Sequence, residues 1–393
     1  MLECLHDKWR RRDVAAFLGE YQTEDENLST TAIREMILAD KESVMYLVDR
    51  ASEGLAREIR ERNITLAEIE YSTRFDESSQ KYREIGVESI KQQVYNYIAV
   101  NGLMELFTRK VGTYQCASIP GRGQVYGKRA IERWIRRNPK KTRCGAKADV
   151  RHCYPSINID KLMSLLRKQV KNEDLLYLID VLVYSYKQGL SIGSYLSQWL
   201  CNYYLSFAYR YVSQNCFKVQ TRRGKVKRTR LYYKILFYMD DILILGSRNA
   251  DVKKTMQMLC EYLNDELGLT VKPNWKLFKV DYIGKDGKHH GDCIDMMGYK
   301  IYRDHTEVRR SIFLRARRAY VKMMRYASKG LVIPKKLAHK CISYYGWFKH
   351  SDSIYFMQKY NIKRLFYKSK RWVKKYDKSK IYRGTASCEL AAA

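Results

Sequence analysis

Apolar residues recur at helical spacing over much of the chain and alternate over a few short stretches, a pattern typical of an α+β fold. Near the N-terminus, one face of a helix is apolar and the other carries Lys, Arg and Glu. Its apolar positions are Val44, Val48, Ala51, Leu55 and Ile59. We therefore interpret residues 1–63 as a helical region that packs against the rest of the chain, in preference to an arm that binds RNA. Residues 64–71 and 81–87 predict two strands joined by a polar turn.

The same patterns predict most of the remaining elements. Helical spacing indicates helices from about residue 311 onward and also near residues 88–108, 128–137, 158–166, 173–186, 195–211 and 252–263. Asn158 is a candidate N-cap, and Gly268 follows the last apolar turn of its helix. Strands are expected near residues 146–150, 277–282 and 294–302. The basic run 218–234 separates a helix from a strand, and such runs are usually solvated loops.

The composition predicts the kind of partner that the chain binds. The chain of 393 residues carries 74 Lys and Arg against 42 Asp and Glu, a formal net charge of +32. This excess predicts a polyanionic partner, and the 33 tyrosines offer surfaces on which bases can stack. The candidate contacts to nucleic acid are basic residues of the 218–234 run and of the C-terminal helical region: Arg222, Arg223, Lys225, Arg228, Arg315, Arg318 and Lys322.

Other classes of protein are disfavoured. Ten cysteines show no C-x-x-C pair, so we expect reduced thiols and neither disulfides nor a zinc site made of cysteines. His289 and His290 stand in a polar loop, where we do not favour a metal site. The apolar runs are too short to cross a membrane, and no signal peptide opens the chain, so we expect a cytoplasmic protein.

The most informative segment is residues 236–245, which read Leu-Phe-Tyr-Met-Asp-Asp-Ile-Leu-Ile-Leu. Asp240 and Asp241 stand between two apolar, strand-like runs, where adjacent carboxylates are costly unless a cation compensates them. A second strand, residues 146–150, ends in another acid, Asp149. Two strands that present carboxylates to metal ions would suit nucleotidyl transfer, whereas an acidic β-turn is the plainer alternative for Asp240 and Asp241.

These two segments resemble motifs A and C of reverse transcriptases. The resemblance implies that Asp149, Asp240 and Asp241 are catalytic. With the carbonyl of Val150, they would bind two Mg²⁺ ions, for which Mn²⁺ could substitute. It also implies an α+β right-hand polymerase fold, with an antiparallel sheet in fingers and palm and a helical thumb. The reaction would be RNA-directed DNA synthesis from deoxynucleoside triphosphates.

Further motifs extend the resemblance to the nucleotide site. Tyr154, five residues after Asp149, stands where the family places the aromatic gate that selects deoxynucleotides. Arg83 matches the position that binds the triphosphate, to which a guanidinium is suited. Lys276, chosen narrowly over Lys272, matches the motif D general acid. The remaining nucleotide-binding candidates belong to a motif B segment and are Ile192, Gly193 and Gln198.

The subgroup is indicated by Ile-Gly-Ser-Tyr-Leu-Ser-Gln at residues 192–198 and by the segment 343–352. Both resemble reverse transcriptases of diversity-generating retroelements, from bacteria or phages, in which an aliphatic residue at position 192 is linked to low fidelity opposite template adenines. Partners would be a structured template RNA, its cDNA and a small basic accessory protein or a second copy. An antiphage-defence enzyme with a non-coding RNA is the alternative. An RNA-dependent RNA polymerase and a catalytically silent RNA-binding scaffold are more remote.

The resemblance also predicts the domain order. Residues 1–63 would form a helical extension, 64–145 the fingers, 146–302 the palm and 303–386 the basic helical thumb. The palm would hold a fingers segment near 160–190 and the basic insertion 218–234. The terminal residues 387–393, which end in three alanines, are left out of this interpretation.

Overall fold

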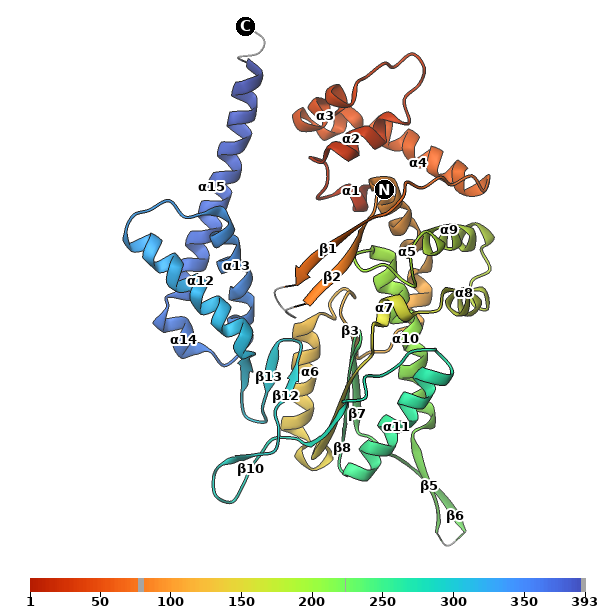
Figure 1. Cartoon of the computed structure of the whole chain (residues 1–393), viewed down its shortest axis with the longest axis vertical. Helices are drawn as coiled ribbons and strands as arrows, with labels where there is room; N and C mark the ends of the chain where they lie inside the picture. The colour runs from red at the N-terminus through yellow and green to blue at the C-terminus, as the bar shows by residue number, and fades with distance from the viewer. Residues whose placement is uncertain (77–80, 223, 390–393) are drawn as a thin grey trace. The chain divides into compact units, whose positions relative to one another are not determined.

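The computed structural model describes residues 1–76, 81–222 and 224–389. It divides into two compact units, Met1–Gly123 with Ala146–Leu277 and Gln124–Gly145 with Phe278–Ala393. Figure 1 labels the helices and strands used below. The assignment of fingers, palm and thumb to residue ranges stays a prediction, and each unit is described by itself.

The first unit begins with helices, as the sequence predicts. These are α1 (Leu2–Leu5), α2 (Arg12–Gly19), α3 (Thr30–Ala39), the 3₁₀ helix η1 (Lys41–Val44) and α4 (Met45–Arg60). Ser29 caps α3, since its side chain accepts a hydrogen bond from the N–H of Ala32. The buried face of α4 contains Val48, Ala51 and Leu55, so the predicted apolar stripe is confirmed as a packing surface.

Two long strands follow, but the first is displaced from its predicted position. β1 (Glu70–Asp76) pairs antiparallel with β2 (Lys81–Val87) along its whole length. The prediction of a strand at 64–71 is therefore wrong for residues 64–69. Apolar alternation suggested that range, whereas the partner strand determines where β1 begins.

Helices form most of the rest of the first unit. They are α5 (Ile90–Lys110), α7 (Cys153–Ser156), α8 (Ile159–Arg167), α9 (Glu173–Tyr184), α10 (Tyr195–Asn215) and α11 (Asn249–Asp265). The predicted cap is confirmed, because Asn158 Oδ1 accepts a hydrogen bond of 2.8 Å from the N–H of Lys161. Helix α10 packs between α5 and α11, and it continues one turn beyond its predicted end.

A five-stranded sheet has the order β3-β7-β8-β4-β9. Its strands are β3 (Gln115–Cys116), β4 (Cys144–Asp149), β7 (Lys234–Tyr238), β8 (Asp241–Gly246) and β9 (Lys276–Lys279). β7 and β8 form an antiparallel hairpin, as the sequence predicts, but Tyr238 pairs with Asp241, so the turn consists of Met239 and Asp240 and Asp241 begins β8. Leu236, Leu243 and most of their neighbours are fully buried, and α11 packs against β8. This burial holds the hairpin that carries the adjacent acids.

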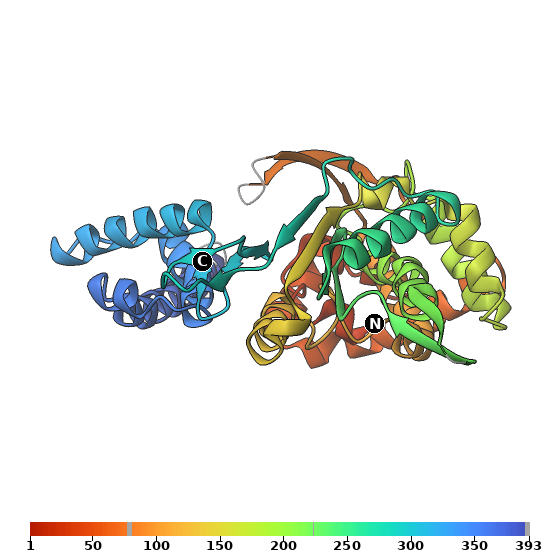
Figure 2. The same ribbon diagram turned by 90° about the horizontal axis from the view of Figure 1, so that it is seen from below.

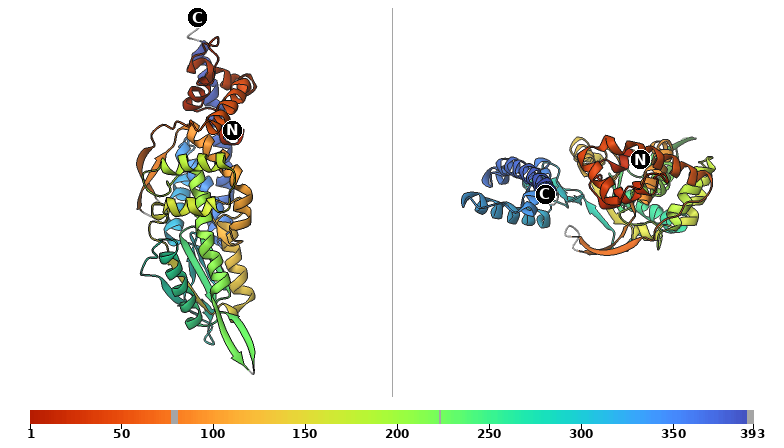
Figure 3. Two further views of the ribbon diagram at one scale, coloured as in Figure 1. Left: turned by 90° about the vertical axis from the view of Figure 1, so that its right-hand side faces the viewer. Right: turned by 90° about the horizontal axis from the view of Figure 1, so that it is seen from above.

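The basic run is not a loop. β5 (Phe217–Arg222) and β6 (Lys225–Arg230) form an antiparallel hairpin, which extends away from the helices of its unit in Figure 3. Successive side chains point to opposite faces along each strand, and all residues of β6 are exposed. The charges of this run obscured the alternation, so the plainer interpretation as a solvated loop is wrong, and the preferred one, contact with nucleic acid, stays a prediction.

The second unit combines short strands with a helical bundle, visible in Figure 2. It begins with α6 (Gln124–Arg137) and the 3₁₀ helix η2 (Pro139–Lys141). Its strands are β10 (Tyr282–Ile283), β11 (His289–His290), β12 (Ile294–Met296), β13 (Tyr299–Ile301) and β14 (Thr306–Val308). Its C-terminal helices are α12 (Arg310–Ser328), α13 (Lys335–Lys349), α14 (Ile354–Lys359) and α15 (Ile362–Glu389).

Two sequence predictions change in this unit. Residues 294–302, predicted as a strand by their pattern although 296–301 resemble the primer-grip hairpin of reverse transcriptases, form a β12–β13 hairpin. Its turn residues Met297 and Gly298 both have positive φ, 54° and 79°. His289 and His290 lie in the short strand β11 and not in a loop. Among the described residues, no helix is both long enough and apolar enough to cross a membrane.

Candidate active site

The end of β4 and the β7–β8 turn lie beside each other. Asp149 is the last residue of β4, and the N–H of the following Val150 donates a hydrogen bond of 3.0 Å to the carbonyl of Asp240. On the other side, the N–H of Lys272 donates to the carbonyl of Asp149 at 2.9 Å. Backbone contacts therefore hold Asp149 between the turn that contains Asp240 and the segment that precedes β9.

Both acidic segments contain a residue in a left-handed conformation. Met239, just before Asp240, has φ 51°, and His152, three residues after Asp149, has φ 45°. Non-glycine residues adopt this conformation at a cost, which the surrounding contacts must offset. Met239 is nearly buried, and its N–H points to the carbonyl of Cys116 at 3.4 Å. These contacts hold the tight turn in place, and the turn determines the positions of Asp240 and Asp241 at the edge of the sheet.

Three carboxylates crowd this place, and their charges interact. Burial, the carboxylate of Asp241 and then that of Asp149 raise the pKa of Asp240 to about 6, while Arg83 opposes the shift. Two lysines balance part of the charge: Lys272 Nζ forms an ion pair with Asp149, and Lys147 Nζ lies 3.6 Å from Asp241 Oδ1. Burial and the two neighbouring carboxylates together make the ionised form of Asp240 costly, a cost that a bound divalent cation would relieve.

Tyr154 is held against the segment that resembles motif B. Its carbonyl accepts a hydrogen bond of 2.9 Å from the N–H of Leu190, and its hydroxyl lies 4.0 Å from Met239 Sδ. The preceding Gly189 has φ 52°, and a Cβ there would lie 2.6 Å from the Tyr154 carbonyl oxygen. A glycine is required at this position, because the two backbones approach too closely for a side chain.

The other nucleotide-site candidates lie next to strand β2. The N–H of Gly86 donates to the carbonyl of Ile192 at 3.3 Å, and a Cβ on Gly193 would touch Ile85 at 3.0 Å. Arg83 lies on β2, exposed, and close enough for its charge to act on Asp240. Gln198 is half-buried in the first turn of α10. The structure therefore brings Arg83, Ile192 and Gly193 together from segments a hundred residues apart.

Comparison of the sequence with models of protein families identifies the family of this chain. A model described as reverse transcriptase (RNA-dependent DNA polymerase) matches residues 75–301, more than half of the chain. The chain belongs to the reverse transcriptase family. The predicted α+β polymerase fold is confirmed, and the enzyme is an RNA-directed DNA polymerase, a nucleotidyltransferase. The sequence of this chain matches no curated protein.

Solved structures resemble this reverse transcriptase only distantly. Telomerase from Candida albicans, in complex with the TWJ fragment of telomeric RNA, is 11% identical with a TM-score of 0.42, over 88% of this chain and 70% of that one. Apo telomerase from Candida tropicalis is also 11% identical, with a TM-score of 0.42, over 78% and 68% of the two chains. At these values the likeness carries no argument about substrate or partner.

Two lysines of the reverse transcriptase, Lys276 and Lys272, are candidates for the motif D general acid. Lys276 is exposed at the start of β9, whereas Lys272 contacts Asp149 both through its N–H and through its ion pair. Of the two lysines, Lys272 is therefore the one that directly contacts a carboxylate, although Lys276 is the preferred candidate from the sequence. The sequence patterns do not predict the roles of Lys147 and Gly189, although Lys147 lies two residues before Asp149 and alternation along β4 places both on one face.

The basic candidates of the reverse transcriptase lie in two places. Lys225 and Arg228 are exposed on β6, and Arg228 lies over the ring of Phe217 at 4.7 Å. The side chain of Arg222 and the whole of Arg223 lie outside the described residues. On α12, Arg315, Arg318 and Lys322 follow each other at intervals of three and four residues; Arg318 and Lys322 are exposed and Arg315 is half-buried. Both places present cations to solvent, as a phosphate-binding surface requires.

Proposed function

We propose that this reverse transcriptase copies a cognate RNA into cDNA at the site formed by Asp149, Asp240 and Asp241. The observation that carries the proposal is the cluster itself: three carboxylates at the end of β4 and in the β7–β8 turn, with the pKa of Asp240 raised to about 6 by burial and by its two neighbours. These acids, with the carbonyl of Val150, would hold two divalent ions, Mg²⁺ or Mn²⁺. When bound, such ions supply charge stabilisation for the attacking and leaving oxygens of nucleotidyl transfer.

The residues around this cluster would bind and orient the substrates. Arg83 on β2 suits the triphosphate, because a guanidinium can donate two hydrogen bonds to phosphate oxygens. Tyr154 would stack under the sugar and exclude a ribose 2′-hydroxyl. Lys276 is the candidate from the sequence for donating a proton to the leaving pyrophosphate, and the contact of Lys272 with Asp149 makes Lys272 its rival.

Polymerase activity tests this assignment directly. Primer extension on an RNA template is measured for the wild type, for Asp240→Asn and for Asp25→Asn, a matched change at an exposed aspartate of the N-terminal region. We expect Asp240→Asn to lose at least about a thousandfold in rate, since several kcal/mol of stabilisation disappear, and Asp25→Asn to match the wild type. Equal activity of all three proteins would refute the catalytic assignment.

We further propose that the enzyme belongs to a diversity-generating retroelement and copies adenines with low fidelity. Support comes from the segment 192–198 and from Ile192, which is half-buried where the motif B segment meets β2. The cDNA made by the wild type, Ile192→Gln and Ile192→Val is sequenced on one adenine-rich template. We expect fewer substitutions opposite adenine with Ile192→Gln and an unchanged number with Ile192→Val. Equal error rates in all three would contradict the role of Ile192.

A second candidate function is antiphage defence with a non-coding RNA as template. The exposed β5–β6 hairpin and the N-terminal helices α1 to α4 favour it, because both are additional surfaces on which a structured RNA could be held. Sequencing the DNA and RNA that purify with the wild type and with Asp240→Asn separates the two. Substituted cDNA complementary to one RNA supports the retroelement, whereas faithful, repetitive or untemplated DNA supports defence.

A further inference from the structure

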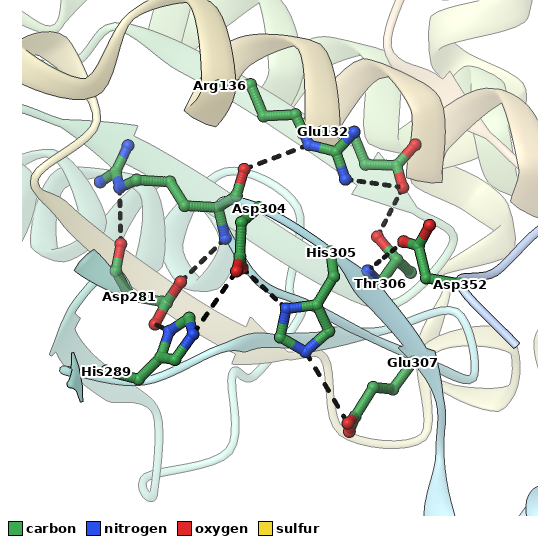
Figure 4. Close-up of polar contacts among 10 residues, drawn as sticks. Glu132, Arg136, Asp281, His289, Asp304, His305, Thr306, Glu307 and Asp352 are labelled. Atoms are coloured by element: carbon green, nitrogen blue, oxygen red, sulfur yellow. Dashed lines mark hydrogen bonds and ion pairs between the residues drawn. The ribbon is translucent and has the colours of Figure 1, made fainter. Parts of the chain in front are cut away.

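A cluster of histidines and acids lies in the second unit, outside the polymerase motifs. His289 belongs to β11, while Asp304 and His305 form the turn between β13 and β14. One nitrogen from each histidine and one carboxylate oxygen of Asp304 lie within 4.8 Å of one another. Figure 4 shows both imidazole rings directed at the carboxylate of Asp304.

The distances suit a small metal ion. His289 Nε2 lies 3.5 Å from Asp304 Oδ2, and His305 Nδ1 lies 2.7 Å from Asp304 Oδ1. Ligand atoms bound to Zn²⁺ at about 2.0–2.1 Å in tetrahedral geometry are about 3.3–3.5 Å apart. The His289–Asp304 pair already has this spacing, and the His305–Asp304 pair would have to widen. All three side chains are partly exposed, which leaves room for water to complete the coordination.

The second ring nitrogen of each histidine also lies near a carboxylate, which orients the imidazole. His289 Nδ1 lies 2.7 Å from Asp281 Oδ1, and His305 Nε2 lies 3.7 Å from Glu307 Oε1. Asp281 is buried, and its second oxygen accepts a hydrogen bond of 2.8 Å from the N–H of Arg303. A carboxylate behind a histidine is the usual outer shell of a metal site, because it holds the tautomer that leaves the other ring nitrogen free for the metal, which is Nε2 in His289 and Nδ1 in His305.

The charges around this cluster also favour a bound cation. With neutral imidazoles, the carboxylates of Asp281, Asp304 and Glu307 outnumber the Arg303 guanidinium, whose donors contact the carbonyls of Asp281, Ile135 and Thr142. A divalent cation would balance this excess. Imidazole nitrogen prefers zinc and similar first-row metals over magnesium, so the ion would differ from that of the polymerase site.

We propose that His289, Asp304 and His305 bind a divalent transition-metal ion of the Zn²⁺ class. The ion would connect the β10–β11 hairpin to the β13–β14 turn, and Arg303 links that turn to α6 and to Thr142, the residue after η2. Its role would be to stabilise this unit, and the proposal is independent of which RNA the enzyme copies.

The experiment measures Zn²⁺ binding to the full chain, freed of metal by chelation and then supplied with excess Mg²⁺ to occupy the polymerase acids. Calorimetry compares the wild type with His289→Gln, His305→Gln and Asp281→Asn. His290→Gln is the matched control, because His290 is the neighbour of His289 in β11 and pairs instead with Asp286. Circular dichroism shows that each variant is folded, and thermal unfolding is followed with and without Zn²⁺.

We expect the wild type and His290→Gln to bind one Zn²⁺ and to unfold at a higher temperature with it. His289→Gln and His305→Gln should lose this site, and Asp281→Asn should bind about 10–100-fold more weakly. The proposal is overturned if the wild type shows no such site, or if His290→Gln loses binding as the others do. Should a variant not fold, X-ray absorption of the Co²⁺-loaded wild type decides, since imidazole ligands support the site and their absence refutes it.

Discussion

The N–H of Val150 donates a hydrogen bond of 3.0 Å to the carbonyl oxygen of Asp240. This contact joins the residue after Asp149 to the turn of the β7–β8 hairpin, although the two are ninety positions apart in the chain. It brings three carboxylates into one place, where each ionised acid makes the next one harder to ionise.

Removing the charge of Asp240 is expected to stabilise the metal-free protein. Its pKa rises from 3.8 to about 6 on folding, so the folded state binds the proton more tightly than the unfolded state between those values. Stability therefore falls as pH rises through this window. Relative to the wild type, Asp240→Asn should gain up to about 3 kcal/mol in free energy of unfolding above pH 6 and about nothing near pH 4.

Urea unfolding in the presence of a chelator, at several pH values, measures this difference. Asp25→Asn is the control and should show no such dependence. Added Mg²⁺ should stabilise the wild type and leave Asp240→Asn nearly unchanged, since the ion needs the carboxylate. A wild type that is as stable as Asp240→Asn at neutral pH without metal would show that the three carboxylates do not repel one another as described.

Tyr154 should determine the choice of sugar. Tyr154→Ala opens the space beneath the nucleotide, so the preference for deoxynucleotides over ribonucleotides should fall by about tenfold or more, equivalent to about 1.4 kcal/mol. Tyr154→Phe keeps the ring and should keep the preference. Values of kcat/KM for the two kinds of triphosphate on one template measure it, and an unchanged ratio in Tyr154→Ala would argue against the gate.

Gly189 should tolerate no side chain. Gly189→Ala places a Cβ 2.5 Å from the carbonyl oxygen of Pro155 at a φ of 52°, so the backbone must move. We expect a loss of about 1–3 kcal/mol in stability and a larger fall in polymerase activity, because Tyr154 is displaced. Gly330→Ala is the control: it also has positive φ, but nothing lies near its Cβ, and its cost should stay near 1 kcal/mol with full activity. Equal effects of the two changes would contradict the close contact.

The basic face of α12 should contribute affinity that depends on salt. Arg318→Gln with Lys322→Gln removes two exposed cations, and the slope of log affinity against log salt should fall by about 0.7–0.9 for each phosphate that these cations neutralise. Filter binding or fluorescence anisotropy at several salt concentrations measures the slope. Lys253→Gln, at an exposed position of α11, should leave the slope unchanged. A double variant with the wild-type slope would show that this face does not bind nucleic acid.

Much of the local structure could be predicted from the sequence, because helical periodicity, caps and hairpin turns depend on neighbours a few residues away. The α4 stripe, the Asn158 cap and the β7–β8 hairpin are examples. Errors arose where a partner strand decides the outcome. β1 begins where β2 can pair with it, and the basic run forms a β5–β6 hairpin whose alternation its charges concealed.

The sequence by itself determined the family and the chemistry on offer: two adjacent acids between apolar strands, a third acid upstream and an excess of cations. Only the tertiary structure decided which groups meet. It placed Lys272 on Asp149, brought Arg83 within reach of Asp240, and gathered His289, Asp304 and His305 around one point. The physical reason is that these contacts join segments far apart in the chain, and periodicity carries no information about such distances.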